Sequence, residues 1–238
     1  MHSNYKAKIA DTFSKYHRNY AQKAYLQKQI AKTLANNLPR MQSPKILEIG
    51  CGTGFLTRHL LDQYPDGVFD ITDLSQTMVE YCQKHYLHSN AQFFVMDGEK
   101  TEVLSQYYDL IVSSMAVQWF EKPLDSLRTL NRLGPVHYAT LGSNSFLEWK
   151  YCLKTLGLAD GTLNLPDWPG IIREENISKK YQNAVHFLKT LKDIGTSATK
   201  QSYRSLSYSD LRRAMTLFDK NTDSHINWHI VYGVLSYK

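Results

Sequence analysis

The sequence predicts an α/β fold, a doubly wound and mostly parallel sheet with helices on both faces. Two observations predict this fold. Short apolar runs alternate with segments of helical periodicity between residues 45 and 141, and the first apolar run ends in a turn that contains Gly50, Gly52 and Gly54. Because parallel strands joined through helices almost always form right-handed crossovers, the alternation indicates an open, twisted sheet.

The individual elements follow from the same periodicity. The expected core strands are 45–49, 67–72, 92–96, 108–113 and 136–141, and the helices between them are 53–63, 75–85 and 124–133. A helix over residues 7–38 comes first, since apolar residues recur there at intervals of three or four. Beyond the alternation we expect helices at 183–192 and 209–218 and a strand at 229–235.

Composition excludes several classes of protein. Apolar and charged residues make up 42% and 21% of the chain, as in an ordinary soluble globule, and no stretch approaches the roughly 20 apolar residues that a membrane span needs. The N-terminus lacks the apolar region of a secretory signal. Cys51, Cys82 and Cys152 show no CxxC spacing, so we expect a reducing, cytoplasmic compartment and no metal. The net charge of +6 favours anionic partners, although the basic residues are dispersed.

The most informative segment is ILEIGCGTG, residues 46–54. In doubly wound sheets ligands bind beyond the carboxyl ends of the strands, and glycine lets a ligand approach the backbone without a Cβ in the way. A phosphate-binding P-loop would require GxxxxGK[ST], and a dinucleotide fingerprint would require glycine or alanine where Phe55 stands. We expect the backbone from Gly50 to Gly54 to lie bare against a different ligand.

The GxGxG spacing resembles motif I of class I S-adenosylmethionine methyltransferases, and three acidic residues fit that resemblance. Asp73 ends the second predicted strand, where it could accept both ribose hydroxyls; its alternative role, capping the next helix, can be filled by Ser75. Asp97 ends the third strand and could accept from the adenine amino group or serve the turn at Gly98. Glu48 lies inside the first strand, where a charge is costly unless paired, and the resemblance places it near the methionine end of the cofactor.

The cofactor is therefore expected to be S-adenosylmethionine. The residues expected to bind it are Glu48, Gly50, Cys51, Gly52, Gly54, Asp73, Leu74, Asp97, Gly98 and Ser113. We expect Cys51 to be a small filler of the turn and not a nucleophile.

Further segments resemble the malonyl-acyl carrier protein O-methyltransferases of biotin synthesis. SSMAVQWF, residues 113–120, is similar to the signature that follows the fourth strand in that family. Similar matches are FSKYHRNYAQKAYLQKQIAKTL near the N-terminus, FLKTLKDIGTSATK in the late lid, and LSYSDLRRAM and HIVYGVL near the C-terminus. The likeness spans nearly the whole chain, with two departures: the loop NRLGPVHY is short, and residues 143–185 are hard to match.

The resemblance implies a Rossmann-like methyltransferase fold in four parts. These are an N-terminal helical lid (1–43), the cofactor-binding core (44–142), a substrate lid inserted after the fifth strand (143–200), and a C-terminal helix and strand that complete the sheet (201–238). It also implies an activity: methylation of the free carboxylate of a malonyl thioester on acyl carrier protein or coenzyme A, an early step of pimeloyl and biotin synthesis. We expect a monomer with neither nucleic acid nor membrane as partner.

Four residues are candidates for catalysis: Tyr20, Gln118, Trp119 and Lys192. A carboxylate has a pKa of about 4 and is already ionised at neutral pH, so no general base is required. Lys192 is the candidate clamp for that carboxylate, with an exposed helix charge as its alternative role. Tyr20 either closes over the cofactor or packs in the core, and Gln118 and Trp119 follow the fourth strand, where Trp119 could equally be a core residue.

Three alternatives stay open from sequence alone. Another class I methyltransferase, acting on a quinone precursor or a small metabolite, would explain the glycine turn and both aspartates equally well. A nucleic-acid methyltransferase would suit the basic pI, but the chain has no aromatic-basic cluster, and SSMA stands where an NPPY-type motif would lie. A non-catalytic module that binds the cofactor is the third alternative.

Overall fold

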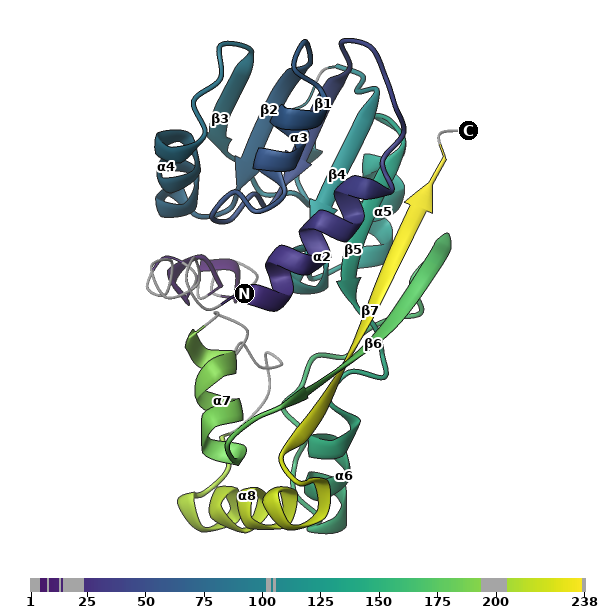
Figure 1. Ribbon diagram of the computed structural model, residues 1–238. Coiled ribbons are helices and arrows are strands. Elements are labelled where there is room, and N and C mark those ends of the chain that lie inside the picture. The colour runs from purple at the N-terminus through teal and green to yellow at the C-terminus, as the bar shows by residue number, and fades with distance from the viewer. Residues whose placement is uncertain are drawn as a thin grey trace.

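A mixed sheet runs through the molecule (Figure 1). The computed structural model describes residues 5–7, 9–12, 14, 24–101, 104, 106–193 and 205–236. Within these ranges the sheet has seven strands in the order β3-β2-β1-β4-β5-β7-β6. The first five strands are parallel, whereas β7 runs antiparallel to both β5 and β6. The predicted doubly wound, mostly parallel fold is confirmed.

The bounds of the strands agree closely with the sequence pattern in the core of the sheet. The strands are β1 (Lys45–Ile49), β2 (Val68–Asp73), β3 (Ala91–Val95), β4 (Leu110–Ser114), β5 (Val136–Leu141), β6 (Ile171–Lys180) and β7 (His225–Leu235). The α-helices are α2 (Tyr25–Asn36), α3 (Thr57–Gln63), α4 (Gln76–His85), α5 (Pro123–Leu130), α6 (Leu147–Thr155), α7 (Ala184–Asp193) and α8 (Tyr208–Thr222), with a 3₁₀ turn, η2, at Val117–Trp119. None of the helices in the described part of the chain is both long and apolar enough to cross a membrane.

The central strands are buried on both faces, which is why they appear in the sequence as continuous apolar runs. Successive side chains of a strand point to opposite faces. On β1, Ile46 therefore joins the core cluster that contains Ile30 of α2, while Leu47 joins the cluster that contains Leu127 of α5. All four of these side chains are fully buried. Helices thus cover both faces and leave the carboxyl ends of the strands for a site.

The expected N-terminal helix over 7–38 is not continuous. At Ala24 the backbone has φ −80° and ψ 50°, outside the helical region, and α2 begins only at Tyr25. Ala24 is buried, and its carbonyl oxygen accepts the first hydrogen bond of α2, from the amide of Lys28. The break lets the earlier residues approach the carboxyl end of the sheet, a tertiary contact that apolar periodicity does not reveal.

The sequence pattern also missed strand β6. In this strand, IIREENISKK, polar residues occupy both faces and most positions are exposed, so neither an apolar run nor a period of two is visible. It forms the edge of the sheet by pairing with β7, for example Glu174 with Val231. Residues 143–200, expected as an inserted lid, therefore contribute an edge strand as well as α6 and α7.

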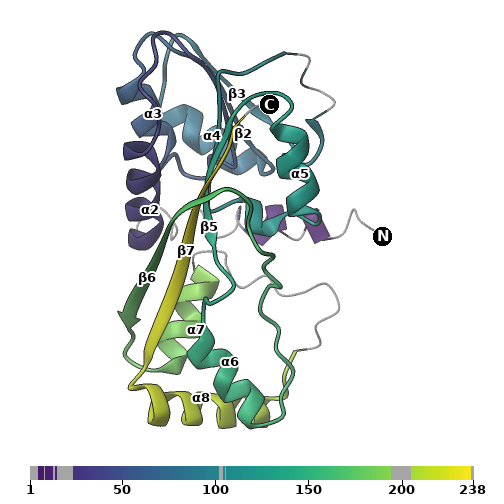
Figure 2. The same ribbon diagram turned by 90° about the vertical axis from the view of Figure 1, so that its right-hand side faces the viewer.

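Helices α6, α7 and α8 form a small lobe at the far end of β6 and β7 from the core strands (Figure 1, Figure 2). Phe187 of α7 is fully buried at its centre. Its ring lies within 5.2 Å of Tyr181 and 5.7 Å of Phe218, measured between centroids, with Trp149 at 6.1 Å. Aromatic pairs at such distances contribute favourably beyond their buried area, so this cluster holds the three helices together.

Replacement of this ring tests that role. We expect Phe187→Ala to lower the free energy of unfolding by about 3–5 kcal/mol, because truncation of a buried phenylalanine leaves a cavity. The measurement is denaturant unfolding followed by circular dichroism. Val185→Ala, two residues away at a side chain that is 57% exposed, is the matched control and should change stability by no more than about 0.5 kcal/mol. Equal losses in the two variants would contradict the packing described here.

Candidate active site

One cavity lies at the carboxyl ends of the parallel strands, where doubly wound sheets bind their ligands. Residues that follow β1, β2, β3 and β4 line it together with part of the N-terminal segment. Of the predicted site residues, the cavity is lined by Glu48, Gly50, Cys51, Gly52, Asp73, Leu74, Asp97, Gly98 and Trp119. The parallel topology brings them together, because their strands all end at the same edge.

The glycine turn has the conformation that its sequence suggests. Gly50, Gly52 and Gly54 have φ values of +76°, +53° and +84°, a region that residues with a Cβ rarely adopt. A Cβ on Gly52 would have nothing within 4 Å, so the backbone there is open to a ligand. A Cβ on Gly54 would overlap the ring of Tyr86. A Cβ on Gly50 would likewise overlap the Cβ of Ala116. The expectation of bare backbone therefore holds at Gly52 and is wrong at Gly50 and Gly54, where the absence of a Cβ is needed for packing.

The Asp73 carboxylate holds this turn against the end of β2. Its Oδ2 accepts a hydrogen bond from the amide of Gly52 at 2.9 Å, and its Oδ1 accepts one from the amide of Ser75 at 2.8 Å. Ser75 is the N-cap of α4, since its hydroxyl accepts from the amide of Met78. Asp73 is thus not the helix cap. Each oxygen of an ionised carboxylate keeps further acceptor capacity, which fits it to receive ribose hydroxyls.

Burial raises the pKa of Asp73, and the amides of Ser75 and Gly52 act in the opposite direction by stabilising the charged form. Burial also acts on Glu48, which is 1% exposed. It raises the pKa of Glu48 to about 8, although the hydroxyl of Thr57 donates to its Oε2 at 2.7 Å. Glu48 therefore carries a proton at neutral pH, and a cationic group placed beside it would favour its ionised form.

Cys51 lies in the turn as a small buried side chain, as expected. A hydrogen bond with Cys82, together with burial, raises the pKa of the Cys51 thiol well above its ordinary value. Because the thiolate is the nucleophilic form, this environment keeps the thiol unreactive.

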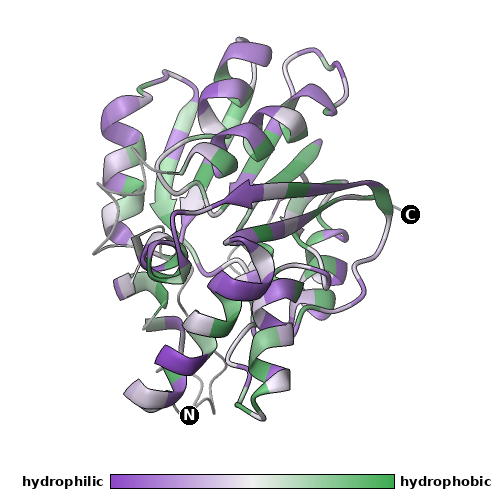
Figure 3. Ribbon diagram, turned by 60° about the horizontal axis from the view of Figure 1, so that its bottom comes forward, coloured by the Kyte–Doolittle hydropathy of each residue, from purple (hydrophilic) through white to green (hydrophobic). Residues whose placement is uncertain are grey.

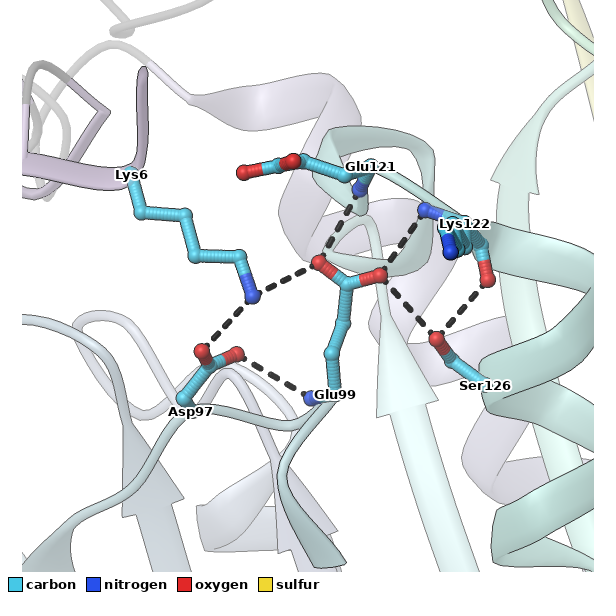
Figure 4. Close-up of polar contacts among 6 residues, drawn as sticks. All are labelled: Lys6, Asp97, Glu99, Glu121, Lys122 and Ser126. Carbon is cyan, nitrogen blue, oxygen red and sulfur yellow. Dashed lines mark hydrogen bonds and ion pairs between the residues drawn. The ribbon is translucent and has the colours of Figure 1, made fainter. Parts of the chain in front are cut away.

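Asp97 belongs to an ion-pair network that the sequence did not reveal (Figure 4). Lys6 Nζ donates to Asp97 Oδ2 at 2.6 Å and lies 2.8 Å from Glu99 Oε2. Asp97 Oδ1 accepts from the amide of Glu99 at 3.1 Å, so Asp97 also serves its turn. Lys6 lies 91 positions from Asp97, and no local pattern links two residues so far apart.

Glu99 continues the network to the start of α5. Its carboxylate accepts from the amides of Glu121 and Lys122 at 3.0 and 2.9 Å and from the hydroxyl of Ser126 at 3.0 Å (Figure 4). Burial acts to raise the pKa of Glu99, but the hydrogen bonds from Lys6 and from these amides outweigh it and lower that pKa. The N-terminal segment is therefore tied across the cavity to two loops of the core.

The other predicted site residues do not line this cavity. The Ser113 hydroxyl donates to the carbonyl oxygen of Ile49 at 3.0 Å. Gln118 is buried and holds the chain after β4 in place: its Nε2 donates to the carbonyl of Met115 and its Oε1 accepts from the Thr140 hydroxyl. Lys192 is exposed on α7. Tyr20 lies outside the described residues.

A second cavity meets the first at Trp119, which lines both. It lies between β5 and the helical lobe, and its walls are largely apolar. They include Phe146, Trp149, Leu153, Phe187, Leu188 and Leu211. Trp119 is 7% exposed, so it is packed in the core and also borders both cavities. This arrangement places a largely apolar cavity beside the cavity at the strand ends.

Comparison with known proteins identifies the family. Residues 46–133 match the model of a methyltransferase domain. The chain is 36% identical over 236 residues to the malonyl-[acyl-carrier protein] O-methyltransferase of Magnetococcus marinus, and the match covers 90% of this chain and 87% of that protein. The chain belongs to the malonyl-[acyl-carrier protein] O-methyltransferase family. It is an S-adenosylmethionine-dependent methyltransferase, as the sequence motifs predicted.

One further relative and one solved structure extend the comparison. The chain is 31% identical over 240 residues to the biotin biosynthesis bifunctional protein BioCD of Bordetella avium; the match covers 94% of this chain and 51% of that larger protein. Among solved structures, a chain of the complex between the Haloferax volcanii Trm112 methyltransferase activator and a methyltransferase is similar, with a TM-score of 0.53 and 16% identity, over 94% of this chain and 96% of the other. The structural likeness shows the methyltransferase fold.

The buried Glu48 predicts a specific dependence of stability on pH. Its pKa is about 8 in the folded protein against 4.5 for an ordinary glutamate, so the folded state holds the proton more tightly. Between these two pH values, stability should therefore fall as pH rises. We expect Glu48→Gln, which stays neutral, to gain on the order of a few kcal/mol relative to wild type between pH 5 and pH 8. Denaturant unfolding of both proteins across that range provides the measurement, and parallel pH profiles would refute the assignment.

Asp73 can be tested through cofactor binding. We expect Asp73→Ala to weaken binding of S-adenosylmethionine by about 10- to 100-fold, the loss that removal of charge-assisted hydrogen bonds of about 1.5–3 kcal/mol would cause. Calorimetry measures the affinity. Asp66→Ala, at an exposed position just before β2, is the matched control. Asp73→Asn is a second variant, whose side-chain oxygen can still accept a hydrogen bond from the turn. If Asp73→Ala binds as tightly as the control does, Asp73 has no place in the site.

Proposed function

We propose that this enzyme transfers the methyl group of S-adenosylmethionine to the free carboxylate of a malonyl thioester on acyl carrier protein, an early step of pimeloyl and biotin synthesis. The observation that carries the proposal is the match to the Magnetococcus marinus relative, which extends over 90% of the chain. The matched methyltransferase domain, in contrast, ends at residue 133. The likeness thus includes the segments that form the apolar cavity.

The residues of the first cavity suit the cofactor. The open backbone at Gly52 lets it approach, Asp73 accepts the ribose hydroxyls, and Asp97 accepts from the adenine amino group with the acceptor capacity that Lys6 leaves. Glu48 lies where the positive charge at the methionine end of the cofactor would lower the pKa of its carboxyl group and so favour loss of its proton. Bound S-adenosylmethionine would supply an electrophilic methyl group for a carboxylate oxygen, and its sulfur would keep the electron pair of the bond that breaks.

The protein's contribution to the transfer is alignment and exclusion of water. A malonyl carboxylate, with a pKa of about 4, is already ionised, so no side chain has to remove a proton from it. This fits a site in which Gln118 and Ser113 are engaged in structural hydrogen bonds. Trp119 lies at the junction of the cavities and provides an apolar surface there. This surface excludes water from the carboxylate and holds the attacking oxygen in line with the methyl carbon and the sulfur.

The clamp for the substrate carboxylate requires a cation inside the site. Lys192 does not meet this requirement, because it is exposed on α7 and lines neither cavity. Among the described residues, the cations that line the two cavities are Lys6, which is paired with Asp97 and Glu99, and Lys150 of α6, whose Nζ donates to the carbonyl oxygen of Ser143 at 3.1 Å. Lys150 is therefore better placed than Lys192 to face a carboxylate in the apolar cavity.

A methyl-transfer assay tests the proposed acceptor. With radiolabelled S-adenosylmethionine, we expect label to enter malonyl-carrier protein, and malonyl-coenzyme A to a smaller or equal extent, as a methyl ester that mild base releases. Acetyl-carrier protein is the matched control, because it lacks only the free carboxylate. Bulk RNA tests the nucleic-acid alternative. Label in the acetyl thioester or in RNA, or none in either malonyl thioester, would overturn the proposal.

A further inference from the structure

Helix α8 presents a row of exposed side chains to solvent. Tyr208, Arg212, Thr216 and Lys220 recur every four residues, so they lie along one side of the helix, and all four are exposed. Tyr208 is 80% exposed, and no neighbour among the described residues covers it. Such exposure is unusual for a large aromatic side chain. The opposite side of α8 carries Phe218, which is fully buried in the lobe.

This row borders a shallow groove between the end of α6 and α8. Leu156 lines the groove on one side and the row of α8 lines it on the other, together with Arg213. Three cations and no carboxylate occur among its lining residues. Arg213 is paired with Asp210 at 3.3 Å, whereas the structure describes no ion pair for Arg212 or Lys220. The groove thus has a positive wall with charge still available.

Two acidic side chains of the lobe, Asp219 and Glu148, are engaged elsewhere and do not neutralise this wall. Asp219 accepts from the amide of Ala184 at 2.7 Å and from the Ser224 hydroxyl at 2.8 Å. Glu148 of α6 accepts from the amide and the side-chain amide of Asn227. Both carboxylates hold the lobe to neighbouring elements. The positive charge of α8 therefore faces solvent unopposed by them.

The groove and the apolar cavity share the same helices. Leu211 lines the cavity, and Arg212, the next residue, lines the groove. The cavity extends from this part of α8 past α6 and α7 to Trp119, where the cofactor cavity begins. A partner in the groove would lie at the end of the molecule away from β1, β2 and β3 (Figure 1, Figure 2). Figure 3, which brings this end forward, shows hydrophilic and hydrophobic segments alternating along its helices.

We propose that the α6–α8 groove is the docking surface for an acidic face of the carrier protein and that the thioester arm of this carrier reaches Trp119 through the apolar cavity. This inference rests on the proposed function and assigns its partner to a surface. An acidic helix of the carrier would place its carboxylates against Arg212 and Lys220, and Tyr208 would be covered at the edge of the contact. Charges at such a surface speed association and orient the partner.

The test compares a substrate that carries the protein with one that does not. The test uses the double variant Arg212→Glu/Lys220→Glu. We expect its KM for malonyl-carrier protein to rise at least about 10-fold at low salt, because each replacement turns an attraction for the acidic carrier surface into a repulsion. The kcat/KM for malonyl-coenzyme A should stay within about twofold, since this thioester needs no protein contact. KM of the wild type for the carrier should also rise with added salt, and the variant should lose most of that dependence.

Lys32→Glu/Lys84→Glu is the matched control, because it makes the same change in net charge at exposed positions of α2 and α4. It should leave both thioesters unaffected, and melting curves verify that each variant folds. An unchanged KM for malonyl-carrier protein in the α8 variant, with malonyl-coenzyme A still methylated, would overturn the docking surface and leave the proposed function standing. Failure of the wild type to methylate either thioester would overturn the function itself. If RNA binding fell in the α8 variant while KM for the carrier stayed the same, the groove would belong to a nucleic acid.

Discussion

The site depends on one carboxylate that joins two strand ends. Asp73, the last residue of β2, accepts hydrogen bonds from the amide of Gly52 in the turn after β1 and from the amide of Ser75 at the start of α4. These bonds fix the left-handed backbone of the turn, which glycine permits and other residues resist. The open backbone at Gly52 and the acceptor oxygens of Asp73 therefore lie in one cavity. Their relative position is set before any ligand binds, and this preorganisation lowers the cost of binding.

A second constraint closes the same cavity from the N-terminal side. Lys6 connects Asp97 to Glu99, and Glu99 in turn accepts from the amides of Glu121 and Lys122 at the start of α5. A carboxylate at the N-terminus of a helix is favoured by the helix dipole. The network thus holds an N-terminal segment, the loop after β3 and the segment before α5 in one arrangement at this cavity.

The lobe of α6, α7 and α8 supplies what the parallel core lacks, which is an apolar chamber beside the cavity at the strand ends. It is carried by β7, which pairs with β5 inside the sheet and with β6 at its edge. Phe187 packs against Tyr181 and Phe218 in the lobe, and together with Trp149 it also lines the chamber. Some residues therefore both pack the lobe and line the chamber. Trp119 marks where the two chambers meet.

The sequence by itself determined the parallel core, because strands buried on both faces appear as apolar runs and the turns between them carry glycine or aspartate. The same local signals placed Gly52, Asp73 and Asp97 at the carboxyl edge of the sheet. Only the tertiary structure decided the break at Ala24, the edge strand β6 and the pairing of Lys6 with Asp97, since each depends on contacts between segments far apart in the chain. It also decided that Gln118 is engaged in structural hydrogen bonds, that Gly54 serves packing and that Lys192 stays outside. Residue type and spacing show what a side chain can do, but its direction is set by the neighbours that folding brings to it.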